Sequence, residues 1–168
     1  MRLAIYAGTF DPITRGHLSV IERAAALFDR LLVVVAVNPA KTPLFSAGER
    51  EEMIREVTRP WPNVACASTE GFVVALARAR GARYLVRGVR GATDVEAELE
   101  LECLNRSLAP EVETVFVPAR AELAEVSSSR LKALAAEGRD ISTYCPPEVA
   151  ARLRRRLAEA TSREASHV

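Results

Sequence analysis

The sequence predicts an α/β fold with a doubly wound, five-stranded parallel sheet, helices on both faces and further helices at the C-terminal end. Short apolar runs alternate with segments of helical periodicity along the chain, the pattern of parallel strands joined by right-handed crossovers. The run at 31–37 is continuous, short and rich in valine, as expected of a strand buried on both faces. These two observations together predict the fold class.

Local signals place the elements in order. Apolar residues at 18, 21, 25 and 28 lie on one face of a helix after the first strand. Ser46 followed by Glu49 is a capping-box pattern that opens a second helix. Gly138 suits a helix end and Pro147 a helix start. We expect strands at residues 3–6, 31–37, 64–67, 84–87 and 114–117, and helices at 17–28, 46–57, 72–80, 94–108, 129–137 and 147–159.

Length and composition restrict the class of protein. The 168 residues predict a single domain over 1–160 followed by a disordered tail at 161–168. Apolar residues make up 49% and charged residues 27%, and the net charge is +1, which argues against a nucleic-acid or membrane-surface binder. No apolar run reaches the roughly 20 residues of a membrane span. The three separated cysteines and the immediate entry into a strand predict a reduced, cytoplasmic protein, and two distant histidines predict no metal site.

Polar clusters follow every predicted strand. They occupy residues 8–11, 38–41, 70–73, 87–90 and 118–129. Ligands of open parallel sheets bind beyond the carboxyl ends of the strands. The sequence therefore predicts one shared site at this edge of the sheet.

The most informative cluster is the loop 8–12 with the segment 14–17 behind it. It places Gly16 and His17 at the start of a helix, where unpaired N–H groups favour anions and an imidazole can donate to a phosphate oxygen. A lone histidine would be expected only to pack on a loop, but Gly16 permits close approach and Thr9 lies in the facing loop. We expect Asp11 with Pro12 to act mainly as a turn.

Cationic side chains follow two other strands. Lys41 stands between prolines 39 and 43 and is interpreted as either a phosphate contact or a solvated lysine. Arg87 and Arg90 flank Gly88, and two forked cations beside a tight backbone suit oligophosphate oxygens. We favour that function over a pair of exposed charges because Arg87 ends an apolar strand.

Further polar segments lie on the later helices. The serines 127–129 predict a helix cap that leaves hydroxyl and N–H groups for an anion. The acidic stripe of Asp94, Glu98 and Glu102 predicts a solvated face, one member of which could contact a ligand. The arginines 152 and 154–156 predict a solvated helix end.

Other phosphate and acyl chemistries lack their motifs. The chain has no GxxxxGK[ST] loop, no Gly-x-Ser-x-Gly elbow and no cysteine–histidine pair. The sequence therefore favours phosphate transfer without a covalent enzyme intermediate.

The segments 6–17, 87–90, 105–106 and 127–132 together resemble the bacterial phosphopantetheine adenylyltransferases, a family of the nucleotidyltransferase superfamily with a (His/Thr)-x-Gly-His motif. The resemblance extends to about residue 158 and implies a Rossmann-like fold. Relatives acting on other nucleotides commonly have His where Thr14 stands, which favours the pantetheine branch.

The resemblance implies two sets of binding residues. For 4'-phosphopantetheine they are Thr9, Lys41, Val73 and Arg87. For ATP they are Thr9, Phe10, His17, Gly88, Val89, Arg90, Glu98, Leu123, Ala124, Glu125, Val126, Ser127, Ser128 and Ser129. The catalytic groups would be His17, Lys41, Thr9 and Arg90.

The chain departs from the family at a few positions. Ala7 replaces a usual proline, Val95 and Ala97 replace aromatic residues, and Ala75 replaces an acidic residue. The stretch 123–125 lacks the usual aromatic residue. These changes bear on adenine packing and nucleotide affinity rather than on the class of reaction.

The expected reaction is AMP transfer from ATP to 4'-phosphopantetheine by in-line displacement, giving dephospho-CoA and pyrophosphate, with Mg²⁺ arriving on ATP. Two alternatives stay open: another acceptor such as nicotinamide mononucleotide, and a non-catalytic nucleotide-binding module. The resemblance further implies a homohexamer and coenzyme A as a feedback ligand.

Overall fold

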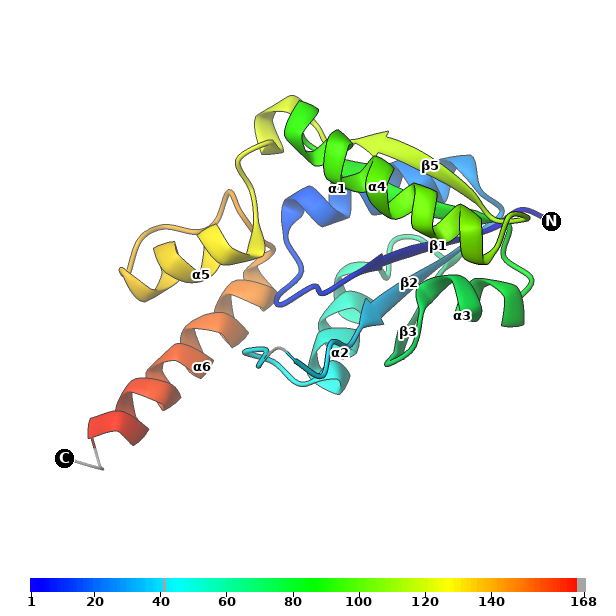
Figure 1. Ribbon diagram of the computed structural model, residues 1–168. Helices are drawn as coiled ribbons and strands as arrows, with labels where there is room; N and C mark the ends of the chain where they lie inside the picture. The colour runs from blue at the N-terminus through cyan, green and yellow to red at the C-terminus, as the bar shows by residue number, and fades with distance from the viewer. Residues whose placement is uncertain (41, 166–168) are drawn as a thin grey trace.

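Five parallel strands form one sheet in the order β3-β2-β1-β4-β5 (Figure 1). The computed structural model describes residues 1–40 and 42–165. The strands are β1 (Leu3–Gly8), β2 (Arg30–Ala36), β3 (Val64–Thr69), β4 (Tyr84–Val89) and β5 (Glu113–Pro118). All five lie where the sequence predicts them, and the predicted fold class is confirmed.

The order in which strands are added to the sheet reverses between β1 and β4, although these two strands are parallel. It builds β1, β2 and β3 outward on one side, then crosses to place β4 beside β1 and β5 beyond it. In such sheets the crevice at the switch point, outside the carboxyl ends of the central strands, is the place for a ligand. Here that point lies between Gly8, which ends β1, and the Gly88 region of β4.

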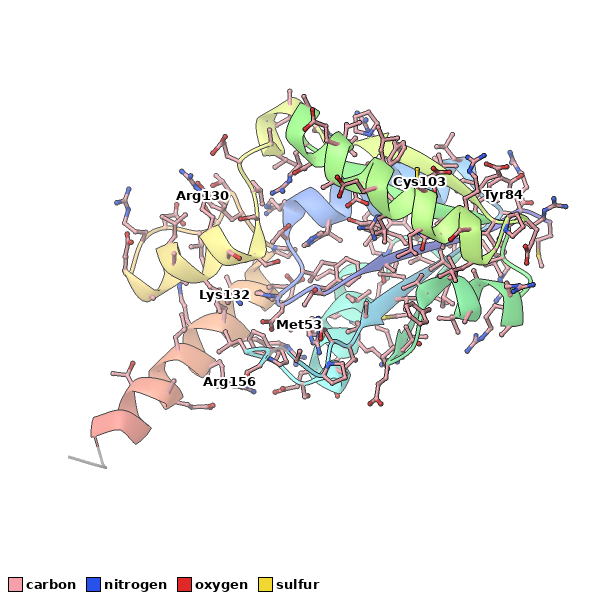
Figure 2. All side chains as sticks on the ribbon, viewed as in Figure 1. Met53, Tyr84, Cys103, Arg130, Lys132 and Arg156 are labelled. Atoms are coloured by element: carbon pink, nitrogen blue, oxygen red, sulfur yellow. The ribbon has the colours of Figure 1, made fainter. Side chains whose placement is uncertain are left out.

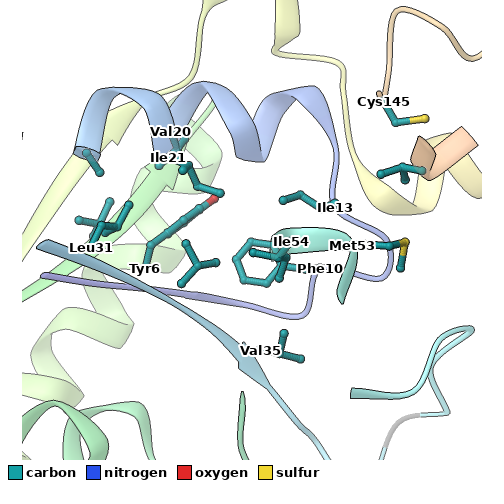
Figure 3. Close-up of a cluster of buried hydrophobic side chains, with 14 of the residues drawn as sticks. Tyr6, Phe10, Ile13, Val20, Ile21, Leu31, Val35, Met53, Ile54 and Cys145 are labelled. Atoms are coloured by element: carbon teal, nitrogen blue, oxygen red, sulfur yellow. The ribbon is translucent and has the colours of Figure 1, made fainter. Parts of the chain in front are cut away.

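Helices cover both faces of the sheet. They are α1 (Arg15–Leu27), α2 (Ala47–Val57), α3 (Val73–Ala79), α4 (Ala92–Leu108), the 3₁₀ turn η1 (Ala121–Leu123), α5 (Ser128–Ala136) and α6 (Pro147–Ala165). Alternation along β1 sends Ala4 and Tyr6 to one core cluster and Ile5 and Ala7 to the other. The first cluster is the larger and includes residues of α1, α2, α5 and α6 (Figure 3).

Capping residues decide where the first two helices begin. Thr14 caps α1 and Ser46 caps α2, each in a reciprocal capping box. The box at Ser46 with Glu49 is the predicted one. The box at Thr14 uses His17 as its other partner and was not predicted as a cap.

Helix α6 continues to Ala165, beyond its predicted end at residue 159. Glu159 pairs with arginines one turn earlier, and the Thr161 hydroxyl donates to the Leu157 carbonyl. These contacts extend the helix into the segment 161–165 that was predicted as tail, while residues 166–168 lie outside the description. Among the described residues, none of the helices combines the length and apolar character that crossing a membrane requires.

Candidate active site

The loop after β1 brings His17 to the carboxyl edge of the sheet. Phe10 adopts a positive φ of 49° and turns its ring into the core. Its ring meets those of Tyr6 and His17 edge-on, with centroids 5.4 and 5.0 Å apart. Phe10 is therefore the support on which the His17 imidazole rests, rather than an open contact surface.

The His17 ring is held in one protonation form. The Thr14 backbone N–H donates to His17 Nδ1 at 3.0 Å, so the ring proton of the neutral imidazole sits on Nε2. Burial, with a smaller contribution from Arg90, lowers the pKa of His17 from 6.5 to about 4. At neutral pH the site therefore presents a neutral Nε2–H donor.

A cavity of about 370 Å³ opens in front of His17, and we call it the polar cavity because its lining is more polar than that of the neighbouring cavity. It takes residues from β1, α1, β4, α4 and the start of α5. Burial raises the pKa of the Tyr6 phenol, so this hydroxyl stays protonated and is no base. The lining residues are Tyr6, Ala7, Gly8, Gly16, His17, Val20, Arg87, Gly88, Arg90, Asp94, Ala97, Glu98, Ala119, Val126, Ser127, Ser128 and Ser129.

Both predicted arginines reach this cavity, and both carry a carboxylate partner. Arg87 forms a two-pronged pair with Glu98, with Nη2 2.7 Å from Oε1, and also donates to the Ala7 carbonyl. Arg90 pairs with Asp94 one turn away, with Nε 2.8 Å from Oδ2. The acidic stripe of α4 is therefore not merely a solvated face. It supplies the counter-charges of both arginines.

The three serines divide their roles. Ser127 caps α5 by accepting from the Arg130 N–H, and the Ser128 hydroxyl donates to the Pro12 carbonyl at 2.8 Å. The exposed Ser129 hydroxyl has no protein partner within the described ranges. The helix start thus keeps one free hydroxyl beside its N–H groups, an arrangement suited to an anion.

A second cavity of about 540 Å³ adjoins the first and is mostly apolar. The two share Ala7 and Arg87, so the Arg87 guanidinium stands where they meet. The lining residues are Ile5, Ala7, Ala36, Val37, Asn38, Pro39, Glu70, Gly71, Phe72, Val73, Leu85, Val86, Arg87, Leu101, Leu104 and Asn105. A phosphate at Arg87 could carry a long, weakly polar arm into this cavity.

Some predicted site residues lie outside the two linings. Thr9 is exposed and its carbonyl accepts from Arg50, and Val89 is buried in β4. Leu123, Ala124 and Glu125 lie in and after η1, before the lining starts at Val126. Lys41 falls outside the described residues.

Sequence reasoning missed several lining residues. Tyr6, Val20 and Ala119 looked like ordinary core or loop positions. Leu101 and Leu104 of α4 line the apolar cavity although they are partly exposed. The row of exposed leucines on α4, which also includes Leu99 and Leu108, was the available signal for these two.

Comparison with known proteins identifies the family. Residues 5–134 match the Cytidylyltransferase-like family. The chain is 46% identical over 153 residues to a phosphopantetheine adenylyltransferase of Heliobacterium modesticaldum, covering 91% of each chain. It is 44% identical over 157 residues to one of Carboxydothermus hydrogenoformans, covering 94% of this chain and 97% of the relative.

This chain belongs to the phosphopantetheine adenylyltransferase family. The resemblance seen in the sequence is thereby confirmed, and so is the class of enzyme, a nucleotidyltransferase. A relative from Gloeobacter violaceus, 46% identical over 158 residues, covers 94% of this chain and 98% of its own. Ala7, Val95 and Ala97 are thus departures within a phosphopantetheine adenylyltransferase, not signs of another family.

A solved structure supports the fold alone. The nicotinic acid mononucleotide adenylyltransferase of Plasmodium falciparum, complexed with NaAD, superposes with a TM-score of 0.65 at 15% identity, covering 95% of each chain. The architecture of this phosphopantetheine adenylyltransferase is therefore shared with an adenylyltransferase named for a different acceptor.

Proposed function

We propose that the protein transfers AMP from ATP to 4'-phosphopantetheine, giving dephospho-CoA and pyrophosphate. The observation that carries this proposal is the pair of cavities that meet at Arg87. The polar cavity suits the nucleotide triphosphate. The apolar cavity suits the pantetheine arm, whose phosphate would lie at the shared guanidinium.

The chemistry needs no general base. A phosphate oxygen of the acceptor is already ionised at neutral pH and attacks the α-phosphorus of ATP. That bond forms while the bond from the α-phosphorus to the bridging oxygen of pyrophosphate breaks. Positioning and charge stabilisation therefore supply the catalysis.

Each functional group has a proposed task. The Nε2–H of His17 donates to the α-phosphate as its charge grows, and the Thr9 segment after β1 contacts the same group. Arg90 and the start of α5, with Ser129, hold the departing β- and γ-phosphates. Arg87 holds the acceptor phosphate, Val73 packs on its arm, and Glu98 contacts ATP. By resemblance Lys41 bridges the two reacting phosphates.

A resident metal cage is not part of the proposal. Among the described residues no group of three histidine, cysteine or acidic side chains could hold an ion. The carboxylates of Asp94 and Glu98 at the polar cavity are engaged by arginines. Mg²⁺ would enter bound to the ATP phosphates, where it would offset their charge.

The test is pyrophosphate release from Mg-ATP with 4'-phosphopantetheine, with nicotinamide mononucleotide as the control acceptor. Release only with the pantetheine compound is the expected result. Release only with the mononucleotide would transfer the proposal to that acceptor. ATP binding without release from either would favour a non-catalytic nucleotide-binding module. Hexamer formation and a feedback role for coenzyme A stay predictions from the resemblance.

A further inference from the structure

The Asp11 carboxylate joins three segments that are distant in the sequence. Its side chain is almost fully buried. Oδ2 accepts from the Leu44 N–H at 2.9 Å and Oδ1 from the Phe45 N–H at 2.9 Å. Oδ2 also pairs with the Lys132 ammonium of α5 at 3.1 Å (Figure 2 shows Lys132 beside the loop after β1). Asp11 thus does far more than form the predicted turn.

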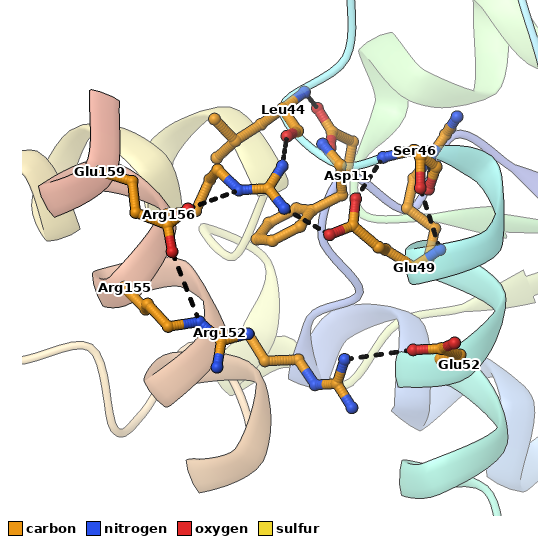
Figure 4. Close-up of polar contacts among 11 residues, drawn as sticks. Asp11, Leu44, Ser46, Glu49, Glu52, Arg152, Arg155, Arg156 and Glu159 are labelled. Atoms are coloured by element: carbon orange, nitrogen blue, oxygen red, sulfur yellow. Dashed lines mark hydrogen bonds and ion pairs between the residues drawn. The ribbon is translucent and has the colours of Figure 1, made fainter. Parts of the chain in front are cut away.

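Arg156 of α6 holds the same two residues from another direction. Its Nη1 donates to the Leu44 carbonyl at 2.6 Å, and its guanidinium lies 4.9 Å from the centre of the Phe45 ring. It also pairs with Glu49 of α2 (Figure 4). The predicted solvated helix end is therefore wrong for Arg156, because the fold brings α6 against the start of α2.

The segments that Asp11 and Arg156 contact are continuous in sequence with residues that line both cavities. Residues 38–39, which line the apolar cavity, lie between the end of β2 and the held Leu44. Residues 127–129, which line the polar cavity, lie one turn before Lys132. Asp11 itself belongs to the loop after β1, which leads to His17 at the start of α1. Within the described chain neither Asp11 nor Arg156 lines either cavity.

We propose that Asp11 and Arg156 are positioning residues that set the spacing between the two substrates. This proposal rests on the proposed function. It gives both residues a role in the reaction although neither contacts a substrate. Asp11 ties the β1 loop to α5 and to Leu44–Phe45, and Arg156 keeps that dipeptide in place. In-line attack depends steeply on such spacing, since a misplacement of about 1 Å can cost on the order of 100-fold in rate.

The sharpest test compares two arginines of one helix. Arg156→Gln and Arg152→Gln each remove an α6 guanidinium that pairs with acidic residues of α2, but only Arg156 touches Leu44 and Phe45. We expect Arg156→Gln to lower kcat about 10-fold while the Kd for each substrate measured alone changes less than about 3-fold. Arg152→Gln should keep kcat within about 2-fold of the wild type.

Asp11→Asn is the second variant. It keeps the shape and one acceptor oxygen, but it loses the charge that pairs with Lys132 and replaces the acceptor of one backbone N–H by an amide NH₂. Its kcat should fall by about 10-fold or more, again with single-substrate Kd values retained. If Asp11→Asn does not fold, the arginine pair decides the question by itself.

Hydrogen exchange of residues 38–46 gives a readout that needs no turnover. Faster exchange in Arg156→Gln than in Arg152→Gln, together with the loss of kcat, would support the proposal. Equal kcat and equal exchange in the two variants would overturn it, leaving Arg156 a purely structural residue. A wild-type protein inactive with 4'-phosphopantetheine would refute the proposed function, and unchanged exchange in Arg156→Gln would refute the positioning role separately.

Discussion

Arg87 and Glu98 form a two-pronged ion pair at the point where the polar and apolar cavities meet. The sequence resemblance assigns the arginine to the acceptor and the glutamate to ATP. The pair therefore links the two proposed substrate sites through one charge contact, which an acceptor phosphate must compete with before it can use the guanidinium.

Glu98→Gln should move the two Michaelis constants in opposite directions. Without the competing carboxylate, Arg87 is freer for the acceptor phosphate, and the acceptor KM should fall about 3- to 10-fold. The KM for ATP should rise because a proposed ATP contact is lost. Steady-state kinetics with the other substrate saturating measures both. Glu102→Gln, one turn away and paired with Arg106, is the matched control. Two unchanged KM values in Glu98→Gln would contradict the linkage.

His17→Ala should lower kcat with little effect on ATP affinity. The Nε2–H donor would be lost where charge develops in the transition state, which costs on the order of 100-fold in kcat. His17→Gln can place an amide N–H near the same position and should retain more activity. Pre-steady-state measurement of pyrophosphate release compares the rate of the chemical step in the two variants. Loss of ATP affinity with kcat intact would show that His17 serves binding alone.

The His17 ring should stay neutral across the physiological pH range. Burial and Arg90 lower its pKa from 6.5 to about 4. As the pH falls, the ring therefore binds a proton at a higher pH in the unfolded chain than in the folded chain. The contribution of His17 to the free energy of unfolding is therefore complete above pH 6.5 and is lost as the pH falls toward 4. Urea unfolding at several pH values, with His17→Gln as the comparison, measures this slope. An NMR titration of the ring with a midpoint near 6.5 would rule the prediction out.

Gly88→Ala should destabilise the fold next to the site. An added Cβ would lie 2.9 Å from Val20 Cγ2 and 3.3 Å from the Tyr6 hydroxyl oxygen. Such overpacking against a stiff valine costs about 1–3 kcal/mol of unfolding free energy. Denaturant unfolding measures it, and adding Val20→Ala should restore part of the loss. Gly48→Ala, at a helical glycine with open space around it, should be neutral or stabilising. Equal effects of the two glycine substitutions would argue against close packing at Gly88.

Much of the fold was accessible from local sequence signals. The run at 31–37 predicted β2, and Ser46 with Glu49 predicted the start of α2, because burial on both faces and capping are recorded in neighbouring residues. The end of α6 was missed because residues 160–165 carry no apolar periodicity, whereas Glu159 and Thr161 make side-chain contacts one turn back along the helix.

The candidate site was predicted in its residue types but not in its contacts. His17, Arg87, Arg90 and the serines were found because polar clusters follow the strands. Their partners were not: Glu98 was predicted as an ATP contact on an otherwise solvated stripe, not as the partner of Arg87, and Asp11 mainly as a turn residue. Each of those contacts crosses from one element to another.

By itself the sequence determined the α/β class, the order of the elements, the family and the cluster of polar and cationic side chains after the strands, the candidate phosphate-binding groups. Only the tertiary structure decided that Arg87 stands between two cavities, that Thr14 fixes the proton of His17 on Nε2, and that Asp11 and Arg156 hold Leu44 and Phe45. The physical reason is the distance along the chain over which each kind of interaction acts. Periodicity and capping act within one or two turns, whereas the joining of cavities and the pairing of buried charges depend on how distant elements pack.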